Sequence, residues 1–168
     1  MNKLEKHPFE PLITPFSQFL VLGTFPSIKS FENNFYYAHP RNQFWKILAS
    51  IFDTKLETTE MKRQFCETKK IALWDVFAQA QRSSNNSSDT NLKETRVNDI
   101  SKLVQEYPHI KELFFTSKKA YNVFQKHFHD FPLKQTLLPS PSPAYALLSF
   151  EKKVEIYKKD FYSTVSNV

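Results

Sequence analysis

Short apolar runs alternate with amphipathic segments along the whole chain, and this alternation restricts the possible folds more than any other feature. Each short run bounded by polar residues is typical of a buried strand, and each longer segment repeats its apolar residues at helical spacing. Strands that alternate with helices pair in parallel, with helices on both faces of the sheet. The predicted strands are 19–22, 71–77, 110–115 and 135–138, and the predicted helices are 42–51, 58–70, 98–107, 117–128 and 144–164.

The sequence therefore predicts an α/β fold, a three-layer αβα sandwich with a central, mainly parallel four-stranded sheet. The chain has 168 residues, which is enough for one core, so we expect a single domain over 1–168. Two stretches, 24–41 and the Ser/Asn/Asp-rich 82–95, are predicted to be irregular, the second as a surface loop. In the last helix, we expect Leu147, Val154, Tyr157 and Phe161 to be buried and Lys152, Lys153, Lys158 and Lys159 to face solvent.

Net charge, cysteine content and hydropathy indicate which classes of protein the chain can belong to. The net charge of +6 is compatible with a polyanionic partner, although many proteins carry such a charge for solubility alone. Cys66 is the only cysteine, and His127 and His129 have no third ligand nearby, so we expect no disulfide, metal or cofactor. The chain shows neither a long apolar stretch nor a secretory signal. These features predict a cytoplasmic monomer that does not enter a membrane.

Gly23 is the only glycine and directly follows the first predicted strand. Glycine permits a positive φ or the close approach of another group to the backbone, so we expect one of these at Gly23. In parallel sheets, the active loops follow the carboxyl ends of the strands. Ser27 and Ser30, in the loop after Gly23, are candidates for holding a phosphate. A purely architectural turn is the alternative.

An aromatic and polar segment, 35–45, leads from this loop into the next helix. Tyrosines in such a loop can stack on a base extruded from a nucleic acid. Asn42 stands at the helix entrance, where it can cap the helix, position a water or contact a base. The proline-rich 139–143 after the last strand is either a stiff phosphate-binding loop or a rigid turn. Asp75, at the end of a strand, is either a structural cap or a carboxylate available for chemistry.

Together and in this order, these segments resemble the uracil-DNA glycosylase superfamily over nearly the whole chain. The resemblance is closest to the hypoxanthine-DNA glycosylase branch, often called family six. That branch has a Gly-x-x-Pro-Ser turn, a Tyr-Tyr-x-x-Pro-x-Asn-x-Phe-Trp segment, a Leu-Trp-Asp-Val strand and a Pro-Ser-x-Ser-Pro-Ala loop. Here the four motifs are Gly23–Ser27, Tyr36–Trp45, Leu73–Val76 and Pro139–Ala144.

The resemblance implies a role for each candidate residue. Asn42 aligns with the catalytic asparagine of the branch, and Phe25 stands where other branches have a catalytic Asp or Asn. Leu138 occupies the place of their catalytic His, and Thr116 the place of an Asn that precedes Gly. The implied base-binding residues are Phe25, Tyr37, His39 and Thr116, and the implied DNA-binding residues are Ser27, Lys29, Ser30, Ser140 and Ser142.

The resemblance implies a monofunctional DNA glycosylase that hydrolyses the N-glycosidic bond of deaminated bases flipped out of DNA. Hypoxanthine is the first candidate base, followed by uracil and xanthine. Two alternatives remain open. The missing Asp and His are compatible with a non-catalytic nucleic-acid-binding module, and an N-glycosidase of free nucleosides is disfavoured by the basic charge and the Pro-Ser loop.

Overall fold

The computed structural model describes residues 4–7, 9–82 and 92–167. Its central sheet has the strand order β3-β2-β6-β7, and all neighbouring strands are parallel. The register places Gly23 beside Asp75 and Leu22 beside Phe115, so the carboxyl ends of β3, β2 and β6 lie together. The strands are β2 (Phe19–Gly23), β3 (Ile71–Asp75), β6 (Glu112–Phe115) and β7 (Lys134–Leu137).

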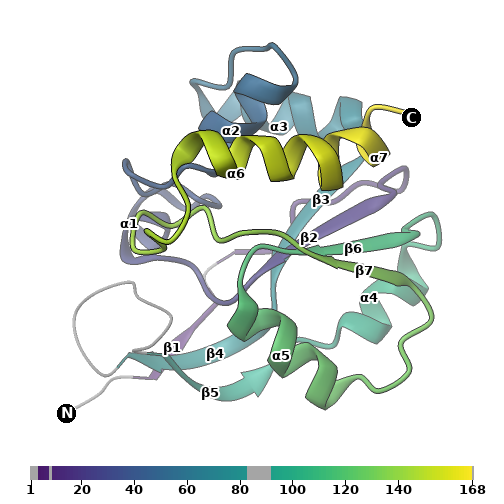
Figure 1. Ribbon diagram of the computed structural model, residues 1–168. Helices are drawn as coiled ribbons and strands as arrows, with labels where there is room; N and C mark the ends of the chain where they lie inside the picture. The colour runs from purple at the N-terminus through teal and green to yellow at the C-terminus, as the bar shows by residue number, and fades with distance from the viewer. Residues whose placement is uncertain (1–3, 8, 83–91, 168) are drawn as a thin grey trace.

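Helices cover both faces of this sheet. Helices α2, α3, α6 and α7 lie over one face, and α4 and α5 lie over the other (Figure 1). The predicted three-layer αβα architecture is confirmed. No helix in the described ranges is long and apolar enough to cross a membrane. The helices that precede the C-terminal segment are α1 (Ile28–Asn33), α2 (Phe44–Ile51), α3 (Thr59–Lys69), α4 (Ile100–Glu106) and α5 (Lys118–His127).

A second sheet was not predicted. It is antiparallel, with the order β1-β4-β5, and it packs beside the central sheet (Figure 1). The predicted strand 71–77 is therefore wrong at its end, because β3 stops at Asp75 and the chain enters the second sheet at Phe77. The predicted loop 82–95 is wrong for its last part, which forms β5, whereas 83–91 lies outside the described residues. The strands are β1 (Leu4–Lys6), β4 (Phe77–Arg82) and β5 (Leu92–Val97).

The C-terminal segment also differs from its prediction. It consists of α6 (Phe150–Tyr157), the π-helical η2 (Lys158–Tyr162) and α7 (Ser163–Val165). The helix begins after Ser149, whose hydroxyl accepts a hydrogen bond from the Lys152 backbone N–H, so the expected start at 144 is wrong. Leu147 therefore lies ahead of the helix and is 85% exposed. Lys153 is only 1% exposed, because it faces the 139–143 loop and not solvent.

The core lies in two apolar clusters, one on each face of the central sheet. Phe114 belongs to one cluster together with Phe161, and its neighbour Phe115 belongs to the other together with Phe124. Successive strand residues point to opposite faces, so a strand buried on both faces is apolar throughout. Because the strands themselves are apolar, polar side chains occur where the strands end.

Phe161→Ala is expected to lower the free energy of unfolding by about 3–5 kcal/mol, because it empties a ring site against Phe114, whose ring centroid lies 4.9 Å away. Phe16→Ala is the matched control, because Phe16 is 70% exposed, and it should change stability by no more than about 0.5 kcal/mol. Urea unfolding of both variants measures the difference. Equal stabilities would contradict the assignment of Phe161 to the core.

Candidate active site

A cavity of about 380 Å³ opens at the carboxyl edge of the central sheet, beyond β2, β3 and β6. Its inner end is built from buried residues at the strand ends, Gly23, Asp75 and Thr116. Its rim is formed by exposed or partly exposed polar side chains from the connecting loops. These rim residues are Ser27, His39, Arg41, Asn42, Ser140 and Ser142. The cavity therefore has a buried polar end and a more open hydroxyl-rich mouth.

Most predicted site residues meet here. The cavity is lined by Asn42, Phe25, Tyr37, His39, Thr116, Ser27, Ser30, Ser140 and Ser142. Lys29 is the exception. It lies on the exposed side of α1, and its Nζ pairs with Glu32 Oε2 at 2.9 Å. The three sequence segments brought together are the loop after Gly23, the entrance to α2 and the Pro-Ser loop.

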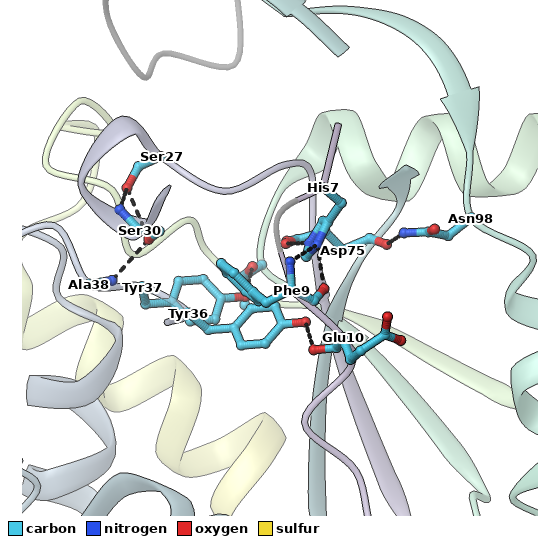
Figure 2. Close-up of polar contacts among 11 residues, drawn as sticks. His7, Phe9, Glu10, Ser27, Ser30, Tyr36, Tyr37, Ala38, Asp75 and Asn98 are labelled. Atoms are coloured by element: carbon cyan, nitrogen blue, oxygen red, sulfur yellow. Dashed lines mark hydrogen bonds and ion pairs between the residues drawn. The ribbon is translucent and has the colours of Figure 1, made fainter. Parts of the chain in front are cut away.

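Ser27 and Ser30 shape the first loop. The Ser27 hydroxyl caps α1 by accepting from the Ser30 backbone N–H, and it also donates to the Ser30 Oγ at 3.1 Å. Ser30 Oγ in turn accepts from the Ala38 backbone N–H at 3.1 Å, and the residue is 1% exposed (Figure 2). Ser27 therefore stays accessible at the rim, whereas the Ser30 hydroxyl ties the two ends of the loop together.

Tyr37 forms one wall of the cavity. Its backbone has a left-handed φ of 53°, and its ring stacks on Phe44 with ring centroids 4.0 Å apart. Its hydroxyl lies 2.8 Å from Thr116 Oγ1. Tyr36 is more deeply buried; its hydroxyl donates to the Glu10 carbonyl, and burial raises its pKa. One face of the Tyr37 ring is thus backed by Phe44.

Asn42 lies at the rim of the cavity and also makes a hydrogen bond to the start of α2. Its Oδ1 accepts from the Phe44 backbone N–H at 2.9 Å, at the first residue of α2. The N-cap of α2 is Gln43, which makes no side-chain cap bond, so the interpretation of Asn42 as the N-cap is wrong; Asn42 precedes the cap and its Oδ1 binds the first helical residue instead. Because the amide oxygen is used in this way, the NH₂ group is what Asn42 offers as a donor to a bound molecule.

Lys153 joins the Pro-Ser loop to the start of α2. Its Nζ donates to Gln43 Oε1 at 2.8 Å and to the Ser142 carbonyl at 3.2 Å. The Gln43 backbone N–H donates to the Pro141 carbonyl, and the Tyr157 hydroxyl to the Pro139 carbonyl. Burial lowers the pKa of Lys153 from its ordinary value. The rigid-turn and ligand-binding interpretations of the loop are therefore compatible, since its backbone is fastened while its serines line the cavity.

Asp75 and His7 form a buried hydrogen-bonded pair that the sequence did not predict. Asp75 is 4% exposed, and its Oδ2 accepts from His7 Nε2 at 2.8 Å (Figure 2). His7 Nδ1 lies 2.8 Å from the Phe9 carbonyl, and the His7 backbone N–H donates to the Ala78 carbonyl in β4. Asp75 carried a weak signal, as a carboxylate at a strand end. Nothing in the sequence distinguished His7, because its position depends on the unpredicted second sheet.

Gly23 is required by close approach and not by backbone conformation, since its φ is not positive. A Cβ at Gly23 would lie 2.7 Å from Asp75 Oδ1, 3.3 Å from the Tyr37 hydroxyl and 3.6 Å from Thr116 Oγ1. The first distance is too short for any side chain. Three polar atoms from three chain segments thus converge over the one residue that has no side chain.

Comparisons with known proteins identify the family of the chain. A family model described as the uracil DNA glycosylase superfamily matches residues 11–165. A hypoxanthine DNA glycosylase of Methanosarcina barkeri is 34% identical over 119 residues, which is 70% of this chain and 74% of the relative. One of Methanosarcina acetivorans is 27% identical over 152 residues, 89% of this chain and 94% of the relative.

A solved structure is also similar. It is a solution NMR structure of a Methanosarcina acetivorans protein assigned as a uracil DNA glycosylase, with a TM-score of 0.73 and 25% identity, and it covers 94% of this chain and 98% of its own. The chain belongs to the uracil DNA glycosylase superfamily. It is a DNA glycosylase, and its macromolecular partner is DNA.

Gly23→Ala is expected to reduce base release from a cleavable duplex by roughly 100-fold, because the new methyl group displaces the Asp75 carboxylate and disturbs the inner end of the cavity. Single-turnover kinetics measures the rate, and thermal unfolding checks that the variant is folded. A folded variant with unchanged activity would contradict the importance of this contact.

Lys153→Met is expected to lower the free energy of unfolding by about 1–3 kcal/mol, because Gln43 Oε1 and the Ser142 carbonyl lose their donor. Base release should slow as the Pro-Ser loop loosens. Lys152→Met is the matched control: Lys152 pairs with Glu155 on the exposed face, so its loss should cost less than about 1 kcal/mol. Urea unfolding and kcat/KM of both variants are the measurements, and equal effects would refute the role of Lys153.

Proposed function

We propose that the protein is a monofunctional DNA glycosylase that hydrolyses the N-glycosidic bond of deaminated bases flipped out of DNA. Hypoxanthine is the first substrate, with uracil and xanthine next. The observation that carries the proposal is the cavity, which has a buried polar end for a base and a hydroxyl-rich rim for the backbone. The two relatives named hypoxanthine DNA glycosylase support the order of substrates.

Cleavage of the glycosidic bond gives the sugar oxocarbenium character and leaves negative charge on the departing base. Such a dissociative reaction needs no strong general base if donors are held ready for the developing charge. Asn42 supplies an NH₂ donor at the rim, and its fixed Oδ1 holds that donor in one orientation. We assign Asn42 the catalytic role, either on the base or on the attacking water.

Phe25 and Tyr37 are proposed as the walls that hold the base. Phe25 is 7% exposed and lines the cavity next to Gly23. Phe44 covers one face of the Tyr37 ring, and we propose that the base stacks on the opposite face. Thr116 contacts the base edge at the inner end, and His39, whose Nδ1 accepts from the Arg41 backbone N–H, supports the loop.

The rim serines are proposed to bind DNA phosphates. Ser27, Ser140 and Ser142 lie at the mouth, where hydroxyls and nearby backbone can contact a nucleotide's flanking phosphates. Ser30 is reassigned to holding the loop, because its hydroxyl is enclosed. Lys29 lies outside the cavity, so its contribution is limited to the general positive charge of the surface.

The experiment that tests the proposal is a panel of oligonucleotides, each with one modified base, incubated with the purified protein. Release of free hypoxanthine from deoxyinosine, leaving an abasic site, is the expected result. A non-catalytic binding module is the second candidate, because Phe25 and Leu138 replace the catalytic Asp and His of other branches. Salt-dependent DNA binding with no base release from any duplex would favour that candidate.

Asn42→Asp separates the catalytic role of Asn42 from its hydrogen bond to the start of α2. An aspartate keeps the oxygen that accepts from Phe44 and removes the NH₂ donor, so the variant should fold normally and lose roughly 10²–10³ in kcat. Asn42→Ala should lose both activity and about 1 kcal/mol of stability. Asn122→Ala, on the exposed face of α5, is the control. Full activity of Asn42→Asp would sink the donor assignment.

A further inference from the structure

The inner end of the cavity contains one carboxylate oxygen, Asp75 Oδ1, that has no role in the proposed cleavage of the glycosidic bond. Asp75 Oδ2 is taken by His7, whereas Oδ1 has no hydrogen-bond partner among the described residues. Oδ1 lies over Gly23, in the same small region as the Tyr37 hydroxyl and Thr116 Oγ1. Asp75 lines the cavity. Asp75 is buried as a residue and lines the cavity, so a donor on a bound molecule would offset the cost of shielding this oxygen from water.

The position of Asp75 determines which part of a bound nucleotide it meets. The phosphates of a flipped nucleotide stay with the DNA backbone, and hence at the rim with the half-exposed serines. The sugar and glycosidic bond follow, near Asn42. The edge of the base furthest from the sugar reaches the buried end, where Asp75 is 4% and Thr116 3% exposed. Asp75 is therefore placed to contact the base and not the sugar.

We propose that Asp75 is a specificity-determining residue that accepts a hydrogen bond from the lactam N–H of a deaminated base, and that His7 is the residue that positions it. This inference rests on the glycosylase function proposed above. An ionised carboxylate is an acceptor only. Hypoxanthine presents N1–H, and uracil presents N3–H, beside a carbonyl. Adenine and cytosine present an unprotonated ring nitrogen there, which a carboxylate repels.

Asp75 as a single acceptor would thus explain how one cavity binds both hypoxanthine, a purine, and uracil, a pyrimidine. The neighbouring carbonyl of the base falls beside the Thr116 hydroxyl, which lies 2.8 Å from the Tyr37 hydroxyl and shares a hydrogen bond with it. Guanine also has an N1–H, so Asp75 separates hypoxanthine from adenine and leaves the rejection of guanine to other contacts.

His7 holds the carboxylate in place. Its ring packs edge-on against Phe9 and Phe25, with centroids 4.9 and 5.9 Å away. The Nε2–H bond to Oδ2 directs Oδ1 towards Gly23 and offsets part of the carboxylate's negative charge. That offset limits the repulsion between Asp75 and the negative charge that gathers on the leaving base.

A thermodynamic cycle with two protein variants and two substrates tests the proposed hydrogen bond between Asp75 and the base N–H. Wild type and Asp75→Ala are each incubated with a duplex containing deoxyinosine or N1-methyldeoxyinosine, and base release is measured in single turnovers. N1-methylation should slow the wild type by roughly 100-fold or more. Asp75→Ala should lose roughly 10- to 100-fold on deoxyinosine, the range for one hydrogen bond to a charged group, and its methylation penalty should shrink by a similar factor.

The inference is overturned if folded Asp75→Ala keeps the wild-type rate on deoxyinosine, or if its methylation penalty is unchanged. The second result would place Asp75 at the sugar, where all bases are affected alike. Should Asp75→Ala not fold, Asp75→Ser replaces it in the cycle. A wild-type protein that releases no base from any duplex overturns the proposed function as well, so the two failures are distinguishable.

The positioning role of His7 has its own test. His7→Phe keeps the aromatic packing and removes the donor, so it should show the same reduced methylation penalty as Asp75→Ala. His7→Gln keeps an N–H donor and should restore much of the discrimination. His109→Phe, at an exposed position, is the control. A purely structural His7 would lower stability and leave the methylation penalty at its wild-type value.

Discussion

The close approach of the Asp75 carboxylate to the Gly23 backbone determines the shape of the cavity. It depends on the parallel register that places the last residues of β2 and β3 side by side. Any side chain at Gly23 would fill the space in which the carboxylate and the Tyr37 and Thr116 hydroxyls meet. At the single glycine of the chain, the end of the sheet contacts the aromatic loop through Tyr37. The N-terminal segment is connected to the same place through the bond of His7 to Asp75.

Central strands and the cavity loops could be predicted because they depend on local patterns. A strand buried on both faces must be apolar throughout, so the runs that contain Leu20 and Phe114 were recognisable. Motifs in the loops then placed Asn42, Tyr37 and the rim serines at one edge of the sheet. The hydroxyl of Ser117 and the oxygen of Asn42 also act at helix starts, as residues of their type commonly do.

The remaining features depend on tertiary contacts that leave no periodic signal. β5 is polar and is held by pairing with β4, so its sequence looks like a loop. His7 is distinguished only by its partner, which lies 68 residues away. Lys153 sits in a helix rich in lysine, and its burial depends on carbonyl and amide oxygens that the Pro-Ser loop and α2 bring to it. Leu147 became exposed because the helix begins after it.

The left-handed backbone of Tyr37 has a consequence for how this protein can change over time. Holding a tyrosine at a φ of 53° costs on the order of 1–3 kcal/mol, which the ring stack on Phe44 and the bond to Thr116 offset. A glycine there would relax the backbone and give up the wall of the cavity. Because the same two contacts offset the strain and build the wall, a substitution at Phe44 or Thr116 would leave Tyr37 strained and the cavity wall weakened at once.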